Sequence, residues 1–224
     1  MLVSAGKIRM EYVRAAGRFS ALRETDLTLR EGRLSVLEGR SGSGKTTLLN
    51  ILAGLQKPSS GEVLYDGTSL YSMGDDELSR FRNDRCGIVP QGQSAVSSLT
   101  VLENVMLPGT IYGLDEGLRD RAESLLEKVG IADLKDVMPS EMSGGEIRRM
   151  AIARALLLEP EILLADEPTA DLDPENTAVV LSLLREAARG GTSVLIVTHD
   201  ADAAACADRM FQMDRGRLTE TAAR

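Results

Sequence analysis

A single glycine-rich stretch sharply narrows the folds open to this chain: Gly39-Arg40-Ser41-Gly42-Ser43-Gly44-Lys45-Thr46-Thr47. It follows residues 33–38, which predict a buried strand, and it precedes apolar residues at helical spacing over 48–52. Strand, glycine loop and helix, in that order, are the context in which Gly-x-x-x-x-Gly-Lys-Thr forms a phosphate-binding loop. The same context disfavours the alternative, a Gly/Ser-rich turn without a ligand. The chain is therefore expected to fold around a parallel sheet with a phosphate site at its edge.

Length and charge exclude several classes of protein. The 224 residues suit one domain carrying an inserted subdomain, not two large independent domains. With 26 Lys and Arg against 34 Asp and Glu, the net charge of -8 predicts no nucleic-acid partner. The longest apolar runs, 156–158 and 194–197, are far below the roughly 20 residues of a membrane span, and residues 1–10 do not resemble a signal peptide. Cys86 and Cys206 suit a reducing compartment and are expected to be small buried hydrophobes.

The pattern along the chain predicts an α/β fold with three parts. Residues 7–13 and 25–29 alternate as strands of an N-terminal antiparallel β layer. Two amphipathic helices, 115–129 and 144–158, predict an inserted α-helical subdomain. Strands at 161–166 and 193–198 are nearly continuous apolar runs, as expected for central parallel strands, and Asp173-Pro174 opens a helix ending near Gly190. We expect a single domain, 1–224, with a nucleotide-binding core of 1–90 and 160–224 and a helical unit of 91–159.

The glycine-rich loop predicts a nucleotide and a metal ion. Its backbone amides and the positive end of the following helix attract phosphate oxygens, and Lys45 would neutralise the β and γ phosphates. The Thr46 hydroxyl would ligate Mg²⁺, which prefers oxygen ligands. ATP and Mg²⁺ are the expected cofactors. The loop residues expected at the nucleotide are Gly39, Ser41, Gly42, Ser43, Gly44, Lys45, Thr46 and Thr47.

Two further strand ends carry polar groups. Asp166 and Glu167 close the apolar run 162–165, at the edge where ligands gather in open α/β sheets. Asp166 would hold Mg²⁺ and Glu167 would accept a proton from the attacking water. Taken alone, these acids favour a simple turn before Pro168, but beside a phosphate-binding loop the functional interpretation prevails. His199, the only histidine, follows the strand 193–198, and its position favours a hydrogen bond to the γ-phosphate over a purely structural role.

A second helix start is also suited to an anion. Ser143 is a plausible N-cap for the helix beginning at Gly144 and Gly145, and its exposed amides would attract a phosphate. Capping alone explains Ser143. Two adjacent glycines at a helix start are costly, however, unless the backbone closely approaches another group.

These motifs, in this order, resemble the nucleotide-binding subunit of an ABC ATPase over nearly the whole chain. The resemblance identifies Ser143-Gly144-Gly145-Glu146 as the signature, Ile162 to Glu167 as the Walker B segment, Ala170-Asp171-Leu172-Asp173 as the D-loop and His199 as the switch histidine. It implies that Gln91 contacts Mg²⁺ and the attacking water, that Asp173 lies at the nucleotide, and that an N-terminal aromatic stacks on adenine. Tyr12 fits that place better than Phe19, although either ring could be core packing.

The resemblance also implies partners. Family members dimerise head to tail, so a homodimer or a heterodimer with a similar ATPase is expected, with Ser143 and Gly145 acting across the interface and Gly144 beside them at the nucleotide. Val101 to Pro108 resembles the lipoprotein-release, macrolide-export and cell-division branch. That branch implies a permease-type membrane subunit on a separate chain and a cytoplasmic location on the inner face of the plasma membrane. Pro90 and Met142 depart from the usual pattern, and Pro90 stiffens the loop before Gln91.

Two other functions stay open at this point. One is a nucleotide-gated scaffold of the cell-division type, in which ATP binding recruits partners and turnover is secondary. The other is an ABC ATPase acting on ribosomes or DNA, disfavoured because such relatives usually carry two cassettes or a coiled-coil insertion.

Overall fold

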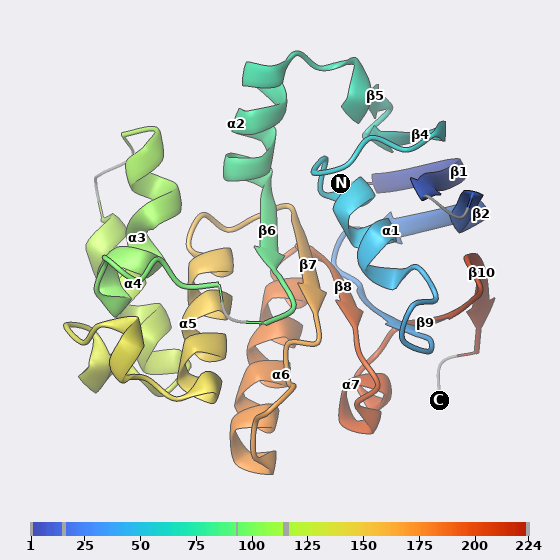
Figure 1. Cartoon of the computed structure of the whole chain (residues 1–224). Coiled ribbons are helices and arrows are strands. Elements are labelled where there is room, and N and C mark those ends of the chain that lie inside the picture. Colours follow the sequence, from blue (N-terminus) through green and yellow to red (C-terminus); the bar gives the residue numbers. More distant parts are fainter. Residues whose placement is uncertain (1, 15–16, 93, 114–116, 223–224) are drawn as a thin grey trace.

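The computed structural model describes residues 2–14, 17–92, 94–113 and 117–222 (Figure 1). Met1, Gln93 of the predicted helical unit, and Asp115 and Glu116 of the predicted helix 115–129 lie outside the described residues. Within these ranges a parallel-stranded sheet, an antiparallel sheet and a group of helices form the α/β architecture expected from the sequence. The fold class is therefore confirmed.

The larger sheet carries the phosphate-binding loop. Its strand order is β10-β9-β3-β8-β7-β6, and every neighbouring pair is parallel except β10 with β9. The strands are β3 (Leu34–Glu38), β6 (Cys86–Val89), β7 (Ile162–Asp166), β8 (Ser193–Val197), β9 (Arg209–Asp214) and β10 (Arg217–Thr221). All five parallel strands end at the same edge, so their carboxyl ends form one rim.

The smaller sheet is antiparallel, in the order β2-β1-β4-β5. Its strands are β1 (Leu2–Arg14), β2 (Gly17–Arg30), β4 (Ser60–Tyr65) and β5 (Thr68–Ser69). The first two are much longer than predicted. Register shifts in β1, with Lys7 at φ 51°, interrupt the apolar alternation from which strand length was read.

The helices are α1 (Lys45–Leu52), α2 (Asp75–Arg85), α3 (Val101–Ile111), α4 (Leu118–Lys128), α5 (Gly144–Leu156), α6 (Pro174–Arg189) and α7 (Ala201–Ala205). Short 3-10 turns occupy 70–72, 132–134 and 139–141. Figure 1 shows α3, α4 and α5 grouped at one end of the molecule and the antiparallel strands at the other. Helices α2 and α3 were not predicted from periodicity. A capping box between Thr100 and Glu103 starts α3 and was the available signal.

The core lies on both faces of the larger sheet. Along β3, Val36 packs into the apolar cluster under the helices α3 to α6, whereas Leu37 packs into the cluster under α1 and the antiparallel sheet. Leu163 and Leu164 on β7 divide between the same two clusters. This two-sided burial explains the continuous apolar runs of the central strands. Burial also raises the pKa of the Cys86 thiol to about 12, and neither described cysteine forms a disulfide.

Among the described residues, no helix combines the length and the apolar character that crossing a lipid bilayer demands.

Helix α5 packs closely on the sheet at Gly87 of β6. A Cβ at this position would lie 2.5 Å from the carbonyl oxygen of Ala155 and 2.7 Å from Leu163 Cδ1. Because the backbone of α5 cannot easily move away from the added methyl group, Gly87→Ala should lower the free energy of unfolding by about 2–3 kcal/mol. In thermal unfolding this corresponds to a Tm lower by roughly 5–10 °C. The control is Gly6→Ala on β1, where no atom lies within 4 Å of the added Cβ, and its Tm should be unchanged. Equal Tm values for the two variants would contradict this packing.

Asp208 should make stability depend on pH. Its carboxylate accepts hydrogen bonds at 2.6 and 2.9 Å from Arg185 on α6 and at 2.8 Å from the Leu34 amide. Arg185, helped by that amide, holds the pKa of the carboxyl below its usual value against the opposing effect of burial. The stabilisation is therefore complete above the ordinary aspartate pKa and is lost as pH falls through the lower folded pKa.

We expect Asp208→Asn to lower the free energy of unfolding by about 1–3 kcal/mol at pH 7, with the deficit shrinking between about pH 5 and pH 2. Urea unfolding at each pH measures it, and Asp214→Asn, at an exposed site on β9, is the control. A deficit independent of pH would rule out the ionic contribution.

Candidate active site

The loop between β3 and α1 is shaped by contacts with the rest of the chain. Gly39 has φ 155°, and a Cβ there would lie 2.4 Å from the carbonyl oxygen of Met213 on β9. Gly44 has φ 114°, and its Cβ would lie 2.5 Å from the carbonyl oxygen of Ala21 on β2. The two motif glycines thus let the loop pack against both sheets. Gly42, at φ 76°, has open space around it.

The start of α1 leaves hydrogen-bond donors free for a ligand. No side chain caps the helix at Gly44, and the first helical bond runs from the Leu48 amide to the Gly44 carbonyl at 2.9 Å. The amides of residues 45–47 therefore have no helical acceptor. Lys45 Nζ donates to the carbonyls of Gly39 and Arg40, which uses two of its three protons. An anion fits here because it would accept the amide protons and the remaining lysine proton.

Thr46 and Asp166 bring oxygen ligands together beside the loop. Thr46 Oγ1 donates to Asp166 Oδ2 at 2.6 Å, although the residues come from α1 and β7. Asp166 is 4% exposed. Among the described residues no group of three His, Cys, Asp or Glu side chains could hold a metal. A hydroxyl and one carboxylate suit Mg²⁺, which keeps several waters and takes other ligands from phosphate.

Glu167 and His199 lie next to each other at the same rim. Glu167 Oε1 is 3.8 Å from His199 Nε2, too far for a hydrogen bond. The Glu167 amide donates to the Val197 carbonyl at 2.7 Å, and its φ is 51°. A non-glycine residue in this conformation stores of order 1–3 kcal/mol of strain, a cost found typically at functional sites. The side chain of His199 is 57% exposed and can reach a ligand above the rim.

These groups line one cavity of about 460 Å³. Eleven predicted site residues meet there: Tyr12, Ser41, Gly42, Gly44, Lys45, Thr46, Thr47, Gln91, Asp166, Glu167 and His199. Phe19 and Ala21 also line it. Tyr12 and Phe19 pair across the β1–β2 hairpin, so the structure places both rings at the cavity. The Tyr12 hydroxyl accepts a bond from Gln56 Nε2 at 2.7 Å, which fixes the orientation of its ring.

Six other predicted residues do not line this cavity. Gly39 and Ser43 belong to the loop but contact protein, and Ser43 Oγ is buried without a partner. The remaining four are Ser143, Gly144, Gly145 and Asp173, on α5 and before α6.

The signature segment is organised by its own capping interactions. Ser143 Oγ accepts from the Glu146 amide at 3.3 Å, while the Glu146 carboxylate accepts from the Ser143 amide at 2.7 Å. The Ser143 amide lowers the pKa of the Glu146 carboxyl. A Cβ on Gly145 would lie 3.1 Å from Leu172 Cδ2, so one of the two glycines permits close packing within this chain. The amides at the start of α5 remain available to an anion.

Asp173 has a structural role as the N-cap of α6. Its carboxylate accepts from the Asn176 amide at 2.8 Å, and this bond lowers the pKa of the Asp173 carboxyl. The preceding Asp171 has φ 65°, so the segment 170–173 is tightly bent before the helix begins.

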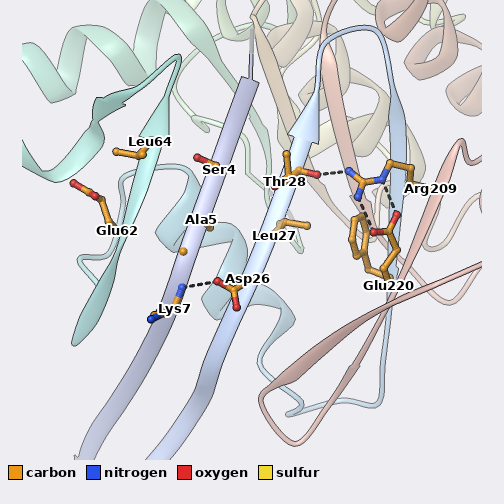
Figure 2. A pocket seen from close by; sticks show the side chains of 12 residues that line it. Ser4, Ala5, Lys7, Asp26, Leu27, Thr28, Glu62, Leu64, Arg209 and Glu220 are labelled. Carbon is orange, nitrogen blue, oxygen red and sulfur yellow. Dashed lines mark hydrogen bonds and ion pairs between the residues drawn. The ribbon is translucent and has the colours of Figure 1, made fainter.

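A second hollow, of about 570 Å³, lies between the antiparallel sheet and β9–β10 (Figure 2). There Arg209 donates at 2.8 Å to both carboxylate oxygens of Glu220 and also to the Thr28 carbonyl. The Lys7 amide donates to Asp26 at 2.9 Å. The Arg209 guanidinium is thus already paired with a carboxylate, and this hollow does not include the glycine-rich loop or the start of α1.

Comparison with known proteins identifies the family. The family model described as ABC transporter matches residues 22–170. The chain belongs to the ABC transporter family. Among curated relatives, the lipoprotein-releasing system ATP-binding protein LolD 2 of Rhodopirellula baltica is 42% identical over 230 residues, covering 99% of this chain and 90% of that protein. LolD of Chromohalobacter salexigens is 44% identical over 199 residues, covering 88% and 84%.

Solved structures agree with this assignment. The ATP-binding cassette MJ0796, in a dimeric post-hydrolysis state bound to ADP and Pi, has a TM-score of 0.92 and 34% identity, with 99% of each chain covered. The family predicted from motif order is therefore confirmed, and this ABC protein binds and hydrolyses ATP.

Lys45 should determine ATP affinity. Removing its charge-assisted bonds to phosphate costs about 1.5–3 kcal/mol, so Lys45→Ala should weaken ATP binding roughly ten- to hundred-fold in calorimetric titration. Lys128→Ala, which breaks an exposed ion pair with Glu186, is the control and should bind ATP normally. Wild-type affinity in a correctly folded Lys45→Ala protein would refute this role.

Proposed function

We propose that this ABC ATPase uses Mg²⁺-dependent ATP hydrolysis in a dimer to drive a membrane subunit encoded on a separate chain. The observation that carries the proposal is the convergence of the loop, Asp166, Glu167, His199 and Gln91 on one cavity. Two relatives support the wider assembly. LolD proteins are ATP-binding proteins of a lipoprotein-releasing system, and MJ0796 forms a dimer.

Within the site each residue has a distinct task. The amides at the start of α1 and Lys45 would hold the phosphates, and Thr46 with Asp166 would hold Mg²⁺, which would supply positive charge beside the phosphates. Glu167 accepts the proton of the attacking water. Its strained backbone conformation, with φ 51°, is of the kind that occurs at functional sites. His199 donates to the γ-phosphate and Gln91 orients the water. Tyr12 stacks on adenine, with Phe19 beside it.

The residues outside the cavity support a composite site. Ser143 and Asp173 are exposed, and neither these residues nor Gly144 and Gly145 line the chain's own nucleotide cavity. In the dimer they would complete the partner's site, so neither nucleotide is enclosed in a monomer. Dimer closure and hydrolysis are then coupled, which converts chemistry into movement. The dimer is a homodimer or includes a similar ATPase.

The proposed division of labour follows the fold. Residues 1–90 and 160–224 form the nucleotide-binding core, and 91–159 form the helical unit that carries the signature. The membrane subunit would hold this chain at the inner face of the membrane, in the cytoplasm. The similarity to LolD favours this over the scaffold and the ribosome- or DNA-directed alternatives.

Glu167→Gln tests both hydrolysis and dimer closure. The amide cannot accept the proton, so ATP turnover should fall at least about hundred-fold while ATP binding is retained, consistent with the general-base contribution. With MgATP the variant should run as a dimer in size-exclusion chromatography with light scattering, and as a monomer without nucleotide. Glu127→Gln, at an exposed site on α4, is the matched control and should behave as wild type.

Purifying the Glu167→Gln dimer from detergent-solubilised native membranes extends this test to the partner. An integral membrane protein should co-purify with MgATP. Turnover at the wild-type rate would exclude Glu167 as the base, and recovery of ribosomal or chromosomal components instead would overturn the membrane assignment.

A further inference from the structure

Gln91 lies where the chain passes from the sheet to the helices. On one side, Val89 ends β6 and pairs with Ala165 of β7 in the core. On the other side the chain is held by the helical unit through Asn104, whose fully buried side chain bonds the backbone of Val96 and Leu99. The position of Gln91 therefore depends on the contacts that connect the end of β6 to the helical unit.

Two arginines of α5 make such ties. Arg154 Nη2 donates to Ser94 Oγ at 2.7 Å, beyond Gln91. Arg148 Nη1 donates to the Pro90 carbonyl at 3.3 Å, immediately before Gln91. Arg148 is only 7% exposed. Helix α5 thus bonds the chain on both sides of Gln91, at Pro90 and at Ser94. The Pro90 contact of Arg148 directly follows the end of the core strand β6.

The spacing of the two arginines matches the span they hold. Six helical residues advance about 9 Å along the axis. Four residues from Pro90 to Ser94 reach at most about 14 Å when extended. Arg148, nearer the start of α5, binds Pro90 before Gln91, and Arg154, nearer its end, binds Ser94 beyond Gln91, so the order of the contacts along α5 matches their order along the chain.

Arg154 is partly buried, which favours keeping its contact with Ser94. Desolvation lowers the pKa of its guanidinium, and no ion pair offsets that effect among the described residues. A charged group withdrawn from water is stabilised when its donors find acceptors. Its bond to Ser94 is therefore difficult to give up.

We propose that Arg148 and Arg154 are positioning residues that fasten Gln91 to α5, so that Gln91 and the signature at the start of the same helix move as one body. The inference rests on the proposed function, in which Gln91 meets this chain's nucleotide and Ser143 meets the partner's. When the partner's nucleotide draws the signature into place, the same helix sets Gln91. The two composite sites are thereby linked through each subunit.

The test combines turnover with a readout that needs no hydrolysis. The variants are Arg148→Gln and Arg154→Gln, together with Ser94→Ala, which removes an acceptor without changing a buried arginine. We expect kcat to fall about ten-fold in each, with the KM for ATP within about two-fold of wild type, because the loop around the phosphates is unchanged. Proteinase K should also cleave between Gln91 and Ser98 several-fold faster, since the segment opens more often.

Arg148→Lys should restore kcat to within about three-fold of wild type. The bond to Pro90 comes from one nitrogen, and a lysine can supply one donor there, whereas it could not replace a bidentate contact. The control is Arg121→Gln, which breaks an exposed ion pair with Glu159 and should alter neither rate.

Unchanged cleavage in folded variants would overturn the attachment of this segment to α5. Faster cleavage with unchanged kcat would overturn its link to hydrolysis. A wild-type protein without ATPase activity would contradict the proposed function, and the cleavage rates would still decide the attachment.

Discussion

The organisation of this protein depends on the burial of its central strands on both faces. Strands β3, β7 and β8 have apolar clusters above and below, so charged groups are excluded from their length. In these three strands charged side chains appear only at the carboxyl ends. Because the strands are parallel, those ends share one rim, and Asp166, Glu167 and His199 gather there with the loop that follows β3. The site is a consequence of how the sheet is buried.

The register of the strands then determines which of these residues lie side by side at the rim. Val89 of β6 lies beside Ala165 of β7, and Asp166 lies beside Val197 of β8. Gln91 and Glu167 each come two residues after the paired residues Val89 and Ala165, so both lie just beyond the ends of neighbouring strands. His199, two residues after Val197, lies close to Glu167. A shift of one residue in either pairing would turn these side chains to the opposite face of the sheet.

Local patterns in the sequence were enough to predict much of this arrangement. The loop, the two-sided strands and the caps at Ser143 and Asp173 are determined by neighbours a few residues apart. The Thr100–Glu103 capping box is equally local, and it would have revealed α3. Other features depend on distant parts of the chain. Gly39 and Gly44 are required by carbonyls on β9 and β2, and Phe19 lies at the cavity as the cross-strand partner of Tyr12. The spacing of residues along the sequence does not predict these contacts between distant parts of the chain.

Helix α5 shows why the same residues serve structure and function. Its first turn is closed by the Ser143–Glu146 capping box, so the signature amides are held in a fixed orientation before any partner approaches. Its next turns bury Arg148 against the end of β6, and Gly87 lets its last turn lie against the sheet. A helix anchored at its start, middle and end transmits displacement with little bending. Glu167, by contrast, sits on a strained backbone whose amide bonds the last residue of β8. In the proposed function, Gln91 and Glu167 would reach the γ-phosphate from supports of different kinds, one that moves with the signature and one fixed to the sheet. Both residues would contact the same water only when the two supports are aligned, and this alignment is the task that the proposal assigns to dimer closure.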